Sequence, residues 1–210
     1  MYEHKRLTGK EPKSSGLGEL APKFESDSNY GIIKLDDYQG KWVIFLSHPT
    51  DFSPTWANEI EKFAHSYCEL RNLNCDLIGI APENNHSLLM WPKAVQEQFG
   101  EKIWFPVIFD SHHEIARSLG MINQEDEAAG VSRSIYIIDD RQILRSIVYY
   151  DPANPDTMNE VIRLVKLLQS SNACGIVTPD SWRPGDEWIL TEPAGEVKPE
   201  GERREITWYF

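Results

Sequence analysis

Short apolar runs alternate with amphipathic stretches through the first two thirds of the chain. Runs of strand length, bounded by polar or turn residues, predict buried strands over 41–47, 75–81 and 104–109. Apolar residues at three- and four-residue steps predict helices over 55–70 and 112–119. Strands that alternate with helices in this way indicate an α/β protein.

The next segment adds a hairpin and a helix. Strands over 134–138 and 143–150 flank the polar residues 139–142, which predicts a hairpin turn. The most regular helix is predicted over 156–169. Its apolar face consists of Met158, Val161, Ile162, Val165 and Leu168. The order of elements suits an α/β sandwich with a mixed central sheet, of the thioredoxin-like kind.

The two ends of the chain differ from the middle in composition. Residues 1–16 are polar and rich in Gly, Ser and Lys, so we expect a mobile leader before a domain over 17–171. Residues 172–210 form an extended arm rich in Pro, Gly and Glu. It ends in the aromatic run 206–210, which we expect to dock on its own domain or on a partner subunit.

Charge and cysteine content exclude several classes of function. The 210 residues carry a formal net charge of −12, which disfavours nucleic acid and anionic membrane surfaces as partners. Three scattered cysteines form neither a disulfide framework nor a CxxC site, and we expect no metal and no cofactor. The adjacent His112 and His113 lack a third ligand at metal spacing and are expected to be solvated. Without a visible signal peptide or membrane span, the expected location is the cytoplasm.

One loop carries most of the functional information. Residues 47–59 read Ser-His-Pro-Thr-Asp-Phe-Ser-Pro-Thr-Trp-Ala-Asn-Glu, which closely resembles the active-site loop of the peroxiredoxins, the AhpC/TSA family. That family reduces peroxides with a thiolate in the pattern Pro, three residues, Thr or Ser, two residues, Cys. Here Pro49 and Ser53 fit the pattern, and Trp56 occupies the cysteine position. Because indole has no ionisable proton near neutral pH, we assign no catalytic residue and expect no peroxide reduction.

Three further segments carry the same resemblance. Residues 17–24 look like the opening of the family domain, and 130–134 resemble the segment that supplies the active-site arginine, here Arg133. Residues 177–186 resemble the start of the C-terminal arm in the one-cysteine subgroup, and Thr178 stands where two-cysteine relatives keep a resolving cysteine. The resemblance implies a homodimer, and a higher oligomer is left open.

A second substitution also opposes peroxidase chemistry. The family usually has another arginine after the last strand, and ungapped matching puts Asp156 at that position. An arginine there would stabilise a thiolate, whereas a carboxylate would destabilise it. The chain therefore differs from the family pattern in both its nucleophile and its local charge.

The remaining pocket candidates have ordinary alternatives. His48 could donate a hydrogen bond to a ligand or act as a base, and a structural hydrogen bond is an equal possibility. Glu59 resembles a family glutamate that orients the arginine, so we expect it to pair with Arg133. Asp51, with Pro49 and Ser53, completes the set of residues that could surround a small anionic or oxygen-rich ligand. Cys68 and Cys75 are expected to be buried and inert.

Trp56 allows three interpretations. It lies in register with Ile60, Phe63 and Tyr67 on one predicted helix face, so it can simply fill the former pocket. It can instead contact a ligand directly. It can also be a point replacement of the cysteine in an otherwise active enzyme, although Asp156 argues against that origin.

The sequence leaves two classes of function. In the first, the chain is a non-catalytic binding or assembly protein built on the family scaffold. In the second, it is an enzyme with repurposed non-thiol chemistry that uses His48, Asp51, Ser53 and Arg133 around a different substrate. A filled space beside Trp56 favours the first class, and an open pocket favours the second.

Overall fold

The computed structural model describes residues 15–47, 66–81, 104–122, 133–150, 157–174, 176–187 and 189–190. The chain divides into two compact units, Met1–Val165 and Lys166–Phe210. The first unit holds the main sheet, and the second holds a small strand pair.

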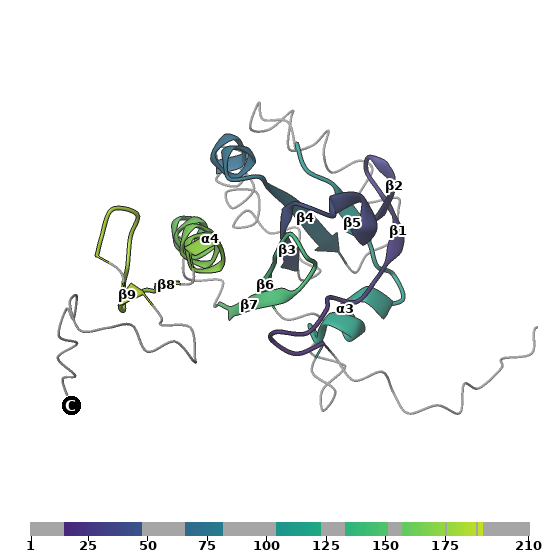
Figure 1. Cartoon of the computed structure of the whole chain (residues 1–210). Coiled ribbons are helices and arrows are strands. Elements are labelled where there is room, and N and C mark those ends of the chain that lie inside the picture. The colour runs from purple at the N-terminus through teal and green to yellow at the C-terminus, as the bar shows by residue number, and fades with distance from the viewer. Residues whose placement is uncertain are drawn as a thin grey trace, which may run out of the picture. The chain divides into compact units, whose positions relative to one another are not determined.

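The main sheet has seven strands in the order β2-β1-β5-β4-β3-β6-β7 (Figure 1). Strand β3 is parallel to β4 and antiparallel to β6, and β4, the central strand, is in turn parallel to β5. The sheet is therefore mixed, which confirms the predicted α/β architecture. The strands are β1 (Glu25–Ser28), β2 (Gly31–Lys34), β3 (Trp42–Ser47), β4 (Cys75–Ala81), β5 (Val107–Phe109), β6 (Ser134–Ile138) and β7 (Leu144–Tyr149).

Strands β3, β4 and β6 are buried along their whole lengths. A strand covered on both faces needs apolar residues at every position, not at alternate ones. This is why their near-continuous apolar runs predicted their bounds so well. The third predicted strand is shorter than expected, because β5 begins only at Val107, directly after Pro106.

The β1–β2 hairpin and the 3-10 helix η1 (Leu35–Tyr38) were not predicted from the sequence. The segment Glu25–Ser28 has no β-branched or aromatic residue, so local propensity does not favour a strand. Its partners specify it instead. It pairs with β2, while the Asn29 side chain accepts a hydrogen bond from the Val107 N–H at 2.7 Å and joins the hairpin to β5.

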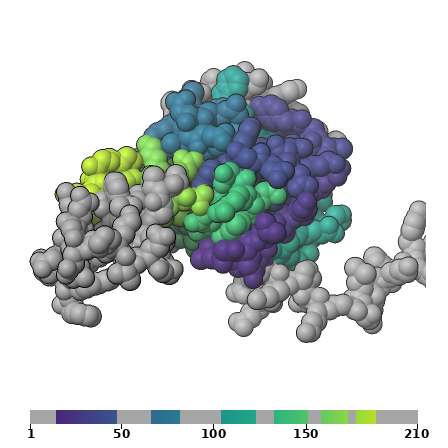
Figure 2. Space-filling model, viewed as in Figure 1, coloured from purple at the N-terminus to yellow at the C-terminus, as the bar shows by residue number. Residues whose placement is uncertain are grey.

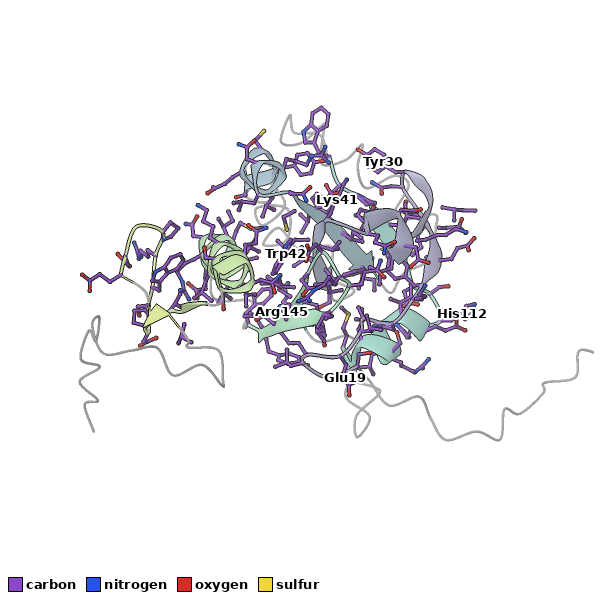
Figure 3. All side chains as sticks on the ribbon, in the orientation of Figure 1. Glu19, Tyr30, Lys41, Trp42, His112 and Arg145 are labelled. Carbon is purple, nitrogen blue, oxygen red and sulfur yellow. The ribbon has the colours of Figure 1, made fainter. Side chains whose placement is uncertain are left out.

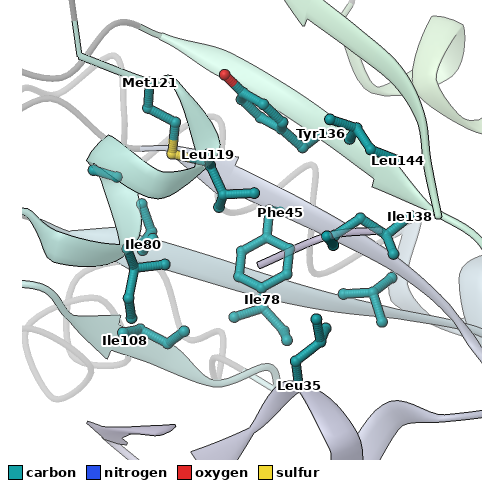
Figure 4. Close-up of a cluster of buried hydrophobic side chains, with 14 of the residues drawn as sticks. Leu35, Phe45, Ile78, Ile80, Ile108, Leu119, Met121, Tyr136, Ile138 and Leu144 are labelled. Carbon is teal, nitrogen blue, oxygen red and sulfur yellow. The ribbon is translucent and has the colours of Figure 1, made fainter. Parts of the chain in front are cut away.

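Phe45 lies at the centre of the core on one face of the sheet (Figure 4). Its ring meets Phe24 edge to face, with centroids 5.4 Å apart. The short helix α3 (Glu114–Leu119) covers this face through Ile115, Ala116 and Leu119. On the opposite face, Trp42, Ile44 and Leu46 are also buried, as the two-residue period of a strand requires.

Two helices differ from their predicted bounds. α3 begins at Glu114, because His113 has a left-handed backbone with φ of 56° and the Asp110 carboxylate accepts hydrogen bonds from Ile115 and Ala116 N–H. His112 is exposed, but His113 is partly buried, so its predicted solvation was wrong. α4 (Thr157–Cys174) runs five residues beyond the expected end, since no helix breaker occurs before Gly175.

The predicted hairpin turn is present between β6 and β7, and one buried carboxylate organises it. Asp139 is fully buried, and its Oδ1 accepts hydrogen bonds from Arg141 N–H at 3.0 Å and Ile143 N–H at 2.9 Å. Its Oδ2 accepts a hydrogen bond from Arg145 Nη1 at 3.1 Å. The carboxylate thus satisfies two main-chain donors and one cation in a turn where Gln142 has φ of 64°.

The first described residues extend the sheet at this hairpin. Leu20 and Ile143 form an antiparallel bridge, and Gly18 N–H and Leu144 N–H donate to Leu144 O and Glu19 O respectively. In Figure 2 this segment, in dark purple, lies directly against the green β6–β7 hairpin. The N-terminal segment therefore covers the beginning of β7, which is an edge strand.

The second unit contains its own ordered turn. β8 (Ile176–Val177) pairs antiparallel with β9 (Ile189–Leu190), and this pairing joins the two ends of the segment between them. Trp182 is buried, and its Nε1 donates to Asp186 O at 3.3 Å. This Pro- and Gly-rich part of the chain is therefore folded locally.

We predict that Asp139→Ala lowers the free energy of unfolding by about 3 kcal/mol, because it leaves buried main-chain donors and a cation without their carboxylate. Asp140→Ala is the matched control, since it removes the adjacent carboxylate, whose Oδ1 has no hydrogen-bond partner. Its effect should stay below about 1 kcal/mol. Urea unfolding of both variants measures the difference. Equal losses would show that the Asp139 contacts do not stabilise the turn.

Candidate functional site

The candidate site begins where β3 ends. Because β6 is antiparallel to β3, with Leu46 opposite Ile135, the last residue of β3 meets the first residue of β6. Arg133 comes immediately before β6 and so lies at the same edge of the sheet as Ser47. The chain leaves β3 into the candidate loop directly beside this arginine.

Two serine hydroxyl groups join the strand ends at this edge. Ser47 Oγ accepts a hydrogen bond from Ser134 N–H at 2.8 Å and donates one to Ser134 O at 3.1 Å. The two Oγ atoms are also 2.9 Å apart and share a hydrogen bond. Both residues are buried, with exposed fractions of 1% and 0%.

Arg133 is also held from the other side. Its main-chain oxygen accepts a hydrogen bond from Tyr150 N–H at 3.3 Å, at the end of β7. Its side chain is partly exposed. Nearby, the Tyr136 and Tyr149 hydroxyl groups lie 3.3 Å apart, and burial together with this hydrogen bond raises the pKa of Tyr136.

The structure thus describes one of the predicted pocket residues, Arg133, and places it beside the start of the loop. The other predicted residues lie outside the described part of the chain, and their positions stay predictions. They are His48, Pro49, Asp51, Ser53, Trp56, Glu59 and Asp156.

At the opposite ends of these strands, near the start of β3 and β4, the polar groups form ion pairs. Asp76, near the start of β4, accepts hydrogen bonds from Lys41 Nζ and Arg71 Nη1, each at 2.8 Å (Lys41 is labelled in Figure 3). Burial, followed by the negative charge of Asp76, raises the pKa of Tyr38 to about 12. The carboxylate is already paired with two cations, so this cluster stabilises structure and offers no free charge.

The two described cysteine thiols differ in accessibility. Cys75 is buried at the start of β4, as predicted, and burial with the nearby Asp76 charge raises the pKa of its thiol. Cys68 is exposed on the helical residues 66–72, so its predicted burial was wrong. The apolar stripe of this helix passes through Leu70, which is fully buried, and Cys68 lies off that stripe.

Within the described ranges, no group of three His, Cys, Asp or Glu side chains is placed to hold a metal ion. No helix in those ranges is both long enough and apolar enough to cross a bilayer. The described edge therefore offers a cation and hydroxyl groups as its polar chemistry.

Ser47 and Ser134 were not predicted as site residues. Each stands at the end of an apolar strand run, next to a segment that the sequence analysis had already singled out. A small polar residue at that place becomes informative only once the strand pairing is known, since a buried hydroxyl group requires hydrogen-bond partners.

Comparison with known proteins agrees with this arrangement. The AhpC/TSA family model matches residues 17–147. A peroxiredoxin of Aquifex aeolicus is 39% identical over 86% of this chain and 82% of the relative, and Peroxiredoxin 2 of Picrophilus torridus is 39% identical over 85% and 88%. A structure of the yeast mitochondrial 1-Cys peroxiredoxin, 29% identical, superimposes with a TM-score of 0.76 over 84% of this chain and 86% of that one.

The mixed seven-stranded sheet, the position of Arg133 and these matches lead to the same assignment. The fold is the thioredoxin-like sandwich of that family. With a family model that covers most of its length and relatives of this similarity, the chain belongs to the AhpC/TSA family, the peroxiredoxins.

Proposed function

We propose that this chain is a peroxiredoxin-family scaffold without the peroxidatic thiol, which acts as a non-catalytic binding or assembly protein. One observation carries the proposal: Trp56 stands at the cysteine position of a loop that otherwise fits the family pattern. Indole can contribute burial and contacts, but it cannot attack a peroxide as a thiolate does.

The position of Cys75 supports the absence of a substitute thiol. Cys75 is paired with Trp42 at the beginning of β3, while the candidate loop follows Ser47 at its end. Five residues of strand separate these levels, or about 16 Å at roughly 3.3 Å per residue. A buried thiol with a raised pKa at that distance cannot reach a peroxide held by Arg133.

The relatives named peroxiredoxin favour a second candidate, in which Trp56 replaces the cysteine of an otherwise competent thiol peroxidase. The two candidates differ in what surrounds the tryptophan. A scaffold that lost its cysteine long ago would have lost supporting charges as well. Asp156 at the second arginine position is such a loss. Restoring the thiol therefore distinguishes them.

We predict no rapid thiol-dependent turnover of hydrogen peroxide or alkyl hydroperoxides. Stopped-flow measurements with excess dithiol test this, and Cys174→Ser serves as the control for background thiol chemistry. Turnover at the rate of a family enzyme that survives Cys174→Ser would overturn the proposed loss of activity.

Restoring the nucleophile should recover only partial activity. Trp56→Cys supplies the thiol, but a carboxylate at the family's second arginine position, as at Asp156, would raise the thiol pKa, whereas arginine would lower it. The double variant with Asp156→Arg should react about tenfold faster at pH 7, with the midpoint of its pH–rate profile shifted downward.

Trp56→Ser is the matched control, because it removes the indole without adding a thiol. It should remain inactive in the same peroxide assay. If Trp56→Cys alone reaches the rate of the double variant, Asp156 does not couple to the site and the second candidate is favoured.

We also propose that the chain assembles as a homodimer through its C-terminal arm. The ordered turn between β8 and β9 shows that part of this arm is built to hold a conformation. Beyond it, Ile206, Trp208 and Phe210 alternate with Thr207 and Tyr209, a pattern that suits a short strand with one apolar face. Burial of such aromatic groups would contribute several kcal/mol to association.

Two truncations test the contribution of the arm. A chain ending at Cys174 keeps all of α4, and a chain ending at Leu190 also keeps the β8–β9 pair. We expect sedimentation velocity to show a dimer dissociation constant at least tenfold higher for both truncated chains than for the full chain. If the shorter chain dimerises as tightly as the full chain, another surface holds the subunits together.

A further inference from the structure

We propose that Ser47 and Ser134 are positioning residues, whose paired hydroxyl groups set the distance between Arg133 and the last residue of β3. The inference rests on the proposed function only in treating this edge as a ligand pocket. The pairing itself is a property of the described strands.

Three hydrogen bonds join the Ser47 side chain to Ser134. Its hydroxyl donates to Ser134 O at 3.1 Å and accepts from Ser134 N–H at 2.8 Å. The second Oγ, 2.9 Å away, then donates to the remaining lone pair of Ser47 Oγ. One side chain thereby engages the N–H, the C=O and the hydroxyl of a single residue on the neighbouring strand.

This arrangement adds a side-chain contact to the strand pairing. The last paired residues of β3 and β6 are Leu46 and Ile135, and one residue beyond them the Ser47 hydroxyl accepts a hydrogen bond from Ser134 N–H. A hydroxyl acceptor at this level holds the strand ends together while the main chain turns away into the following loop.

Ser134 is bonded directly to Arg133, so the contact between Ser47 and Ser134 also constrains the Arg133 backbone. Ser134 is held by β3, and the Arg133 carbonyl is held by Tyr150 N–H at the end of β7. The Arg133 backbone is therefore fixed from two neighbouring strands. Loss of the Ser47 hydroxyl would free one of these attachments and leave a buried N–H without this acceptor.

The pair also explains why buried polar residues occur at the end of two apolar strands. Both hydroxyl groups are at least 99% buried, where an unpaired hydroxyl is costly and an alanine would be tolerated more easily. Structural stability alone does not call for them, since neighbouring residues of β3 and β6 that face each other in this register are apolar, such as Leu46 and Ile135. A role in placing the adjacent arginine does.

The test compares Ser47→Ala with Ser134→Ala in the full chain. Ser47→Ala removes the acceptor for Ser134 N–H, while Ser134→Ala leaves that acceptor in place, removes the Ser134 hydroxyl with its bonds to Ser47 Oγ and Tyr136, and serves as the control. Amide hydrogen exchange by NMR should accelerate at least tenfold at Ser134 and Tyr150 in Ser47→Ala, and less than threefold in Ser134→Ala. The Arg133 Nε–H signal should shift in the first variant.

The Asp139 amide, which donates to Ile143 O at the far end of β6, separates positioning from general stability. Its exchange should be unchanged in Ser47→Ala. Equal acceleration at Ser134 and Asp139, or an unshifted Arg133 signal, would overturn the proposal. In the unmodified chain, fast exchange at Ser134 would overturn it without any variant.

A second readout links the pair to the pocket. In the Trp56→Cys, Asp156→Arg background, adding Ser47→Ala should reduce the rate constant for hydrogen peroxide at least tenfold more than adding Ser134→Ala. Equal reductions would overturn the proposal. If that background shows no peroxide reaction, the assignment of the site fails, while the exchange measurements still decide the role of the pair.

Discussion

The antiparallel pairing of β3 with β6 is the constraint on which the rest of the described sheet depends. β3 is the only strand in the described ranges that joins the parallel strands β4 and β5 to the antiparallel β6–β7 hairpin. Its register, with Phe45 opposite Tyr136 and Leu46 opposite Ile135, decides which side chains enter the core. A shift of one residue would exchange the two faces of a strand that is buried on both. The same register brings the end of β3 to Arg133.

The groups that stabilise the sheet and the groups of the candidate site lie at opposite ends of its strands. At the amino end of β3 and β4, Asp76 is paired with Lys41 and Arg71, and the Asp139 carboxylate closes the hairpin. These charges satisfy each other and their neighbouring main-chain groups. At the opposite edge, the strands end in neutral hydroxyl groups beside a partly exposed arginine. Among the described residues, this end of the sheet thus carries a partly exposed cation beside the end of β3, where the candidate loop begins.

The sequence predicted the parts of the fold that depend on continuous apolar runs. Strands β4 and β6 match their predicted bounds, because burial on both faces leaves a clear signal. It did not predict β1, whose residues Glu25–Ser28 become a strand through pairing with β2 and β5. Single positions were harder again. Cys68 lies next to a buried stripe but outside it, and a rotation of one residue around a helix, about 100°, decides between the two.

The candidate site also contains a part that could be predicted from the sequence and a part that could not. Arg133 could be named because it stands in a segment that resembles a family motif, and the strand register places it beside the end of β3. The Ser47–Ser134 pair could not, because its meaning depends on two residues 87 positions apart in the sequence. A serine at the end of a strand has no special signal until its partner is known.

The chemistry of a peroxidase and the stability of its scaffold place different demands on the chain. A thiolate needs a nearby cation and a polar pocket, and these features oppose burial. The contacts that hold this sheet, from the Asp139 turn to the pairing of Trp42 with Cys75, need no reactive group. A scaffold of this kind can lose its nucleophile and keep its fold. Under the proposed function, Trp56 stands in place of the thiol and Asp156 in place of the second arginine, so the chain carries neither the nucleophile nor that cation. Under the proposed function, the retained Arg133 and the hydroxyl pair beside it are the part of the old site that still has a binding role.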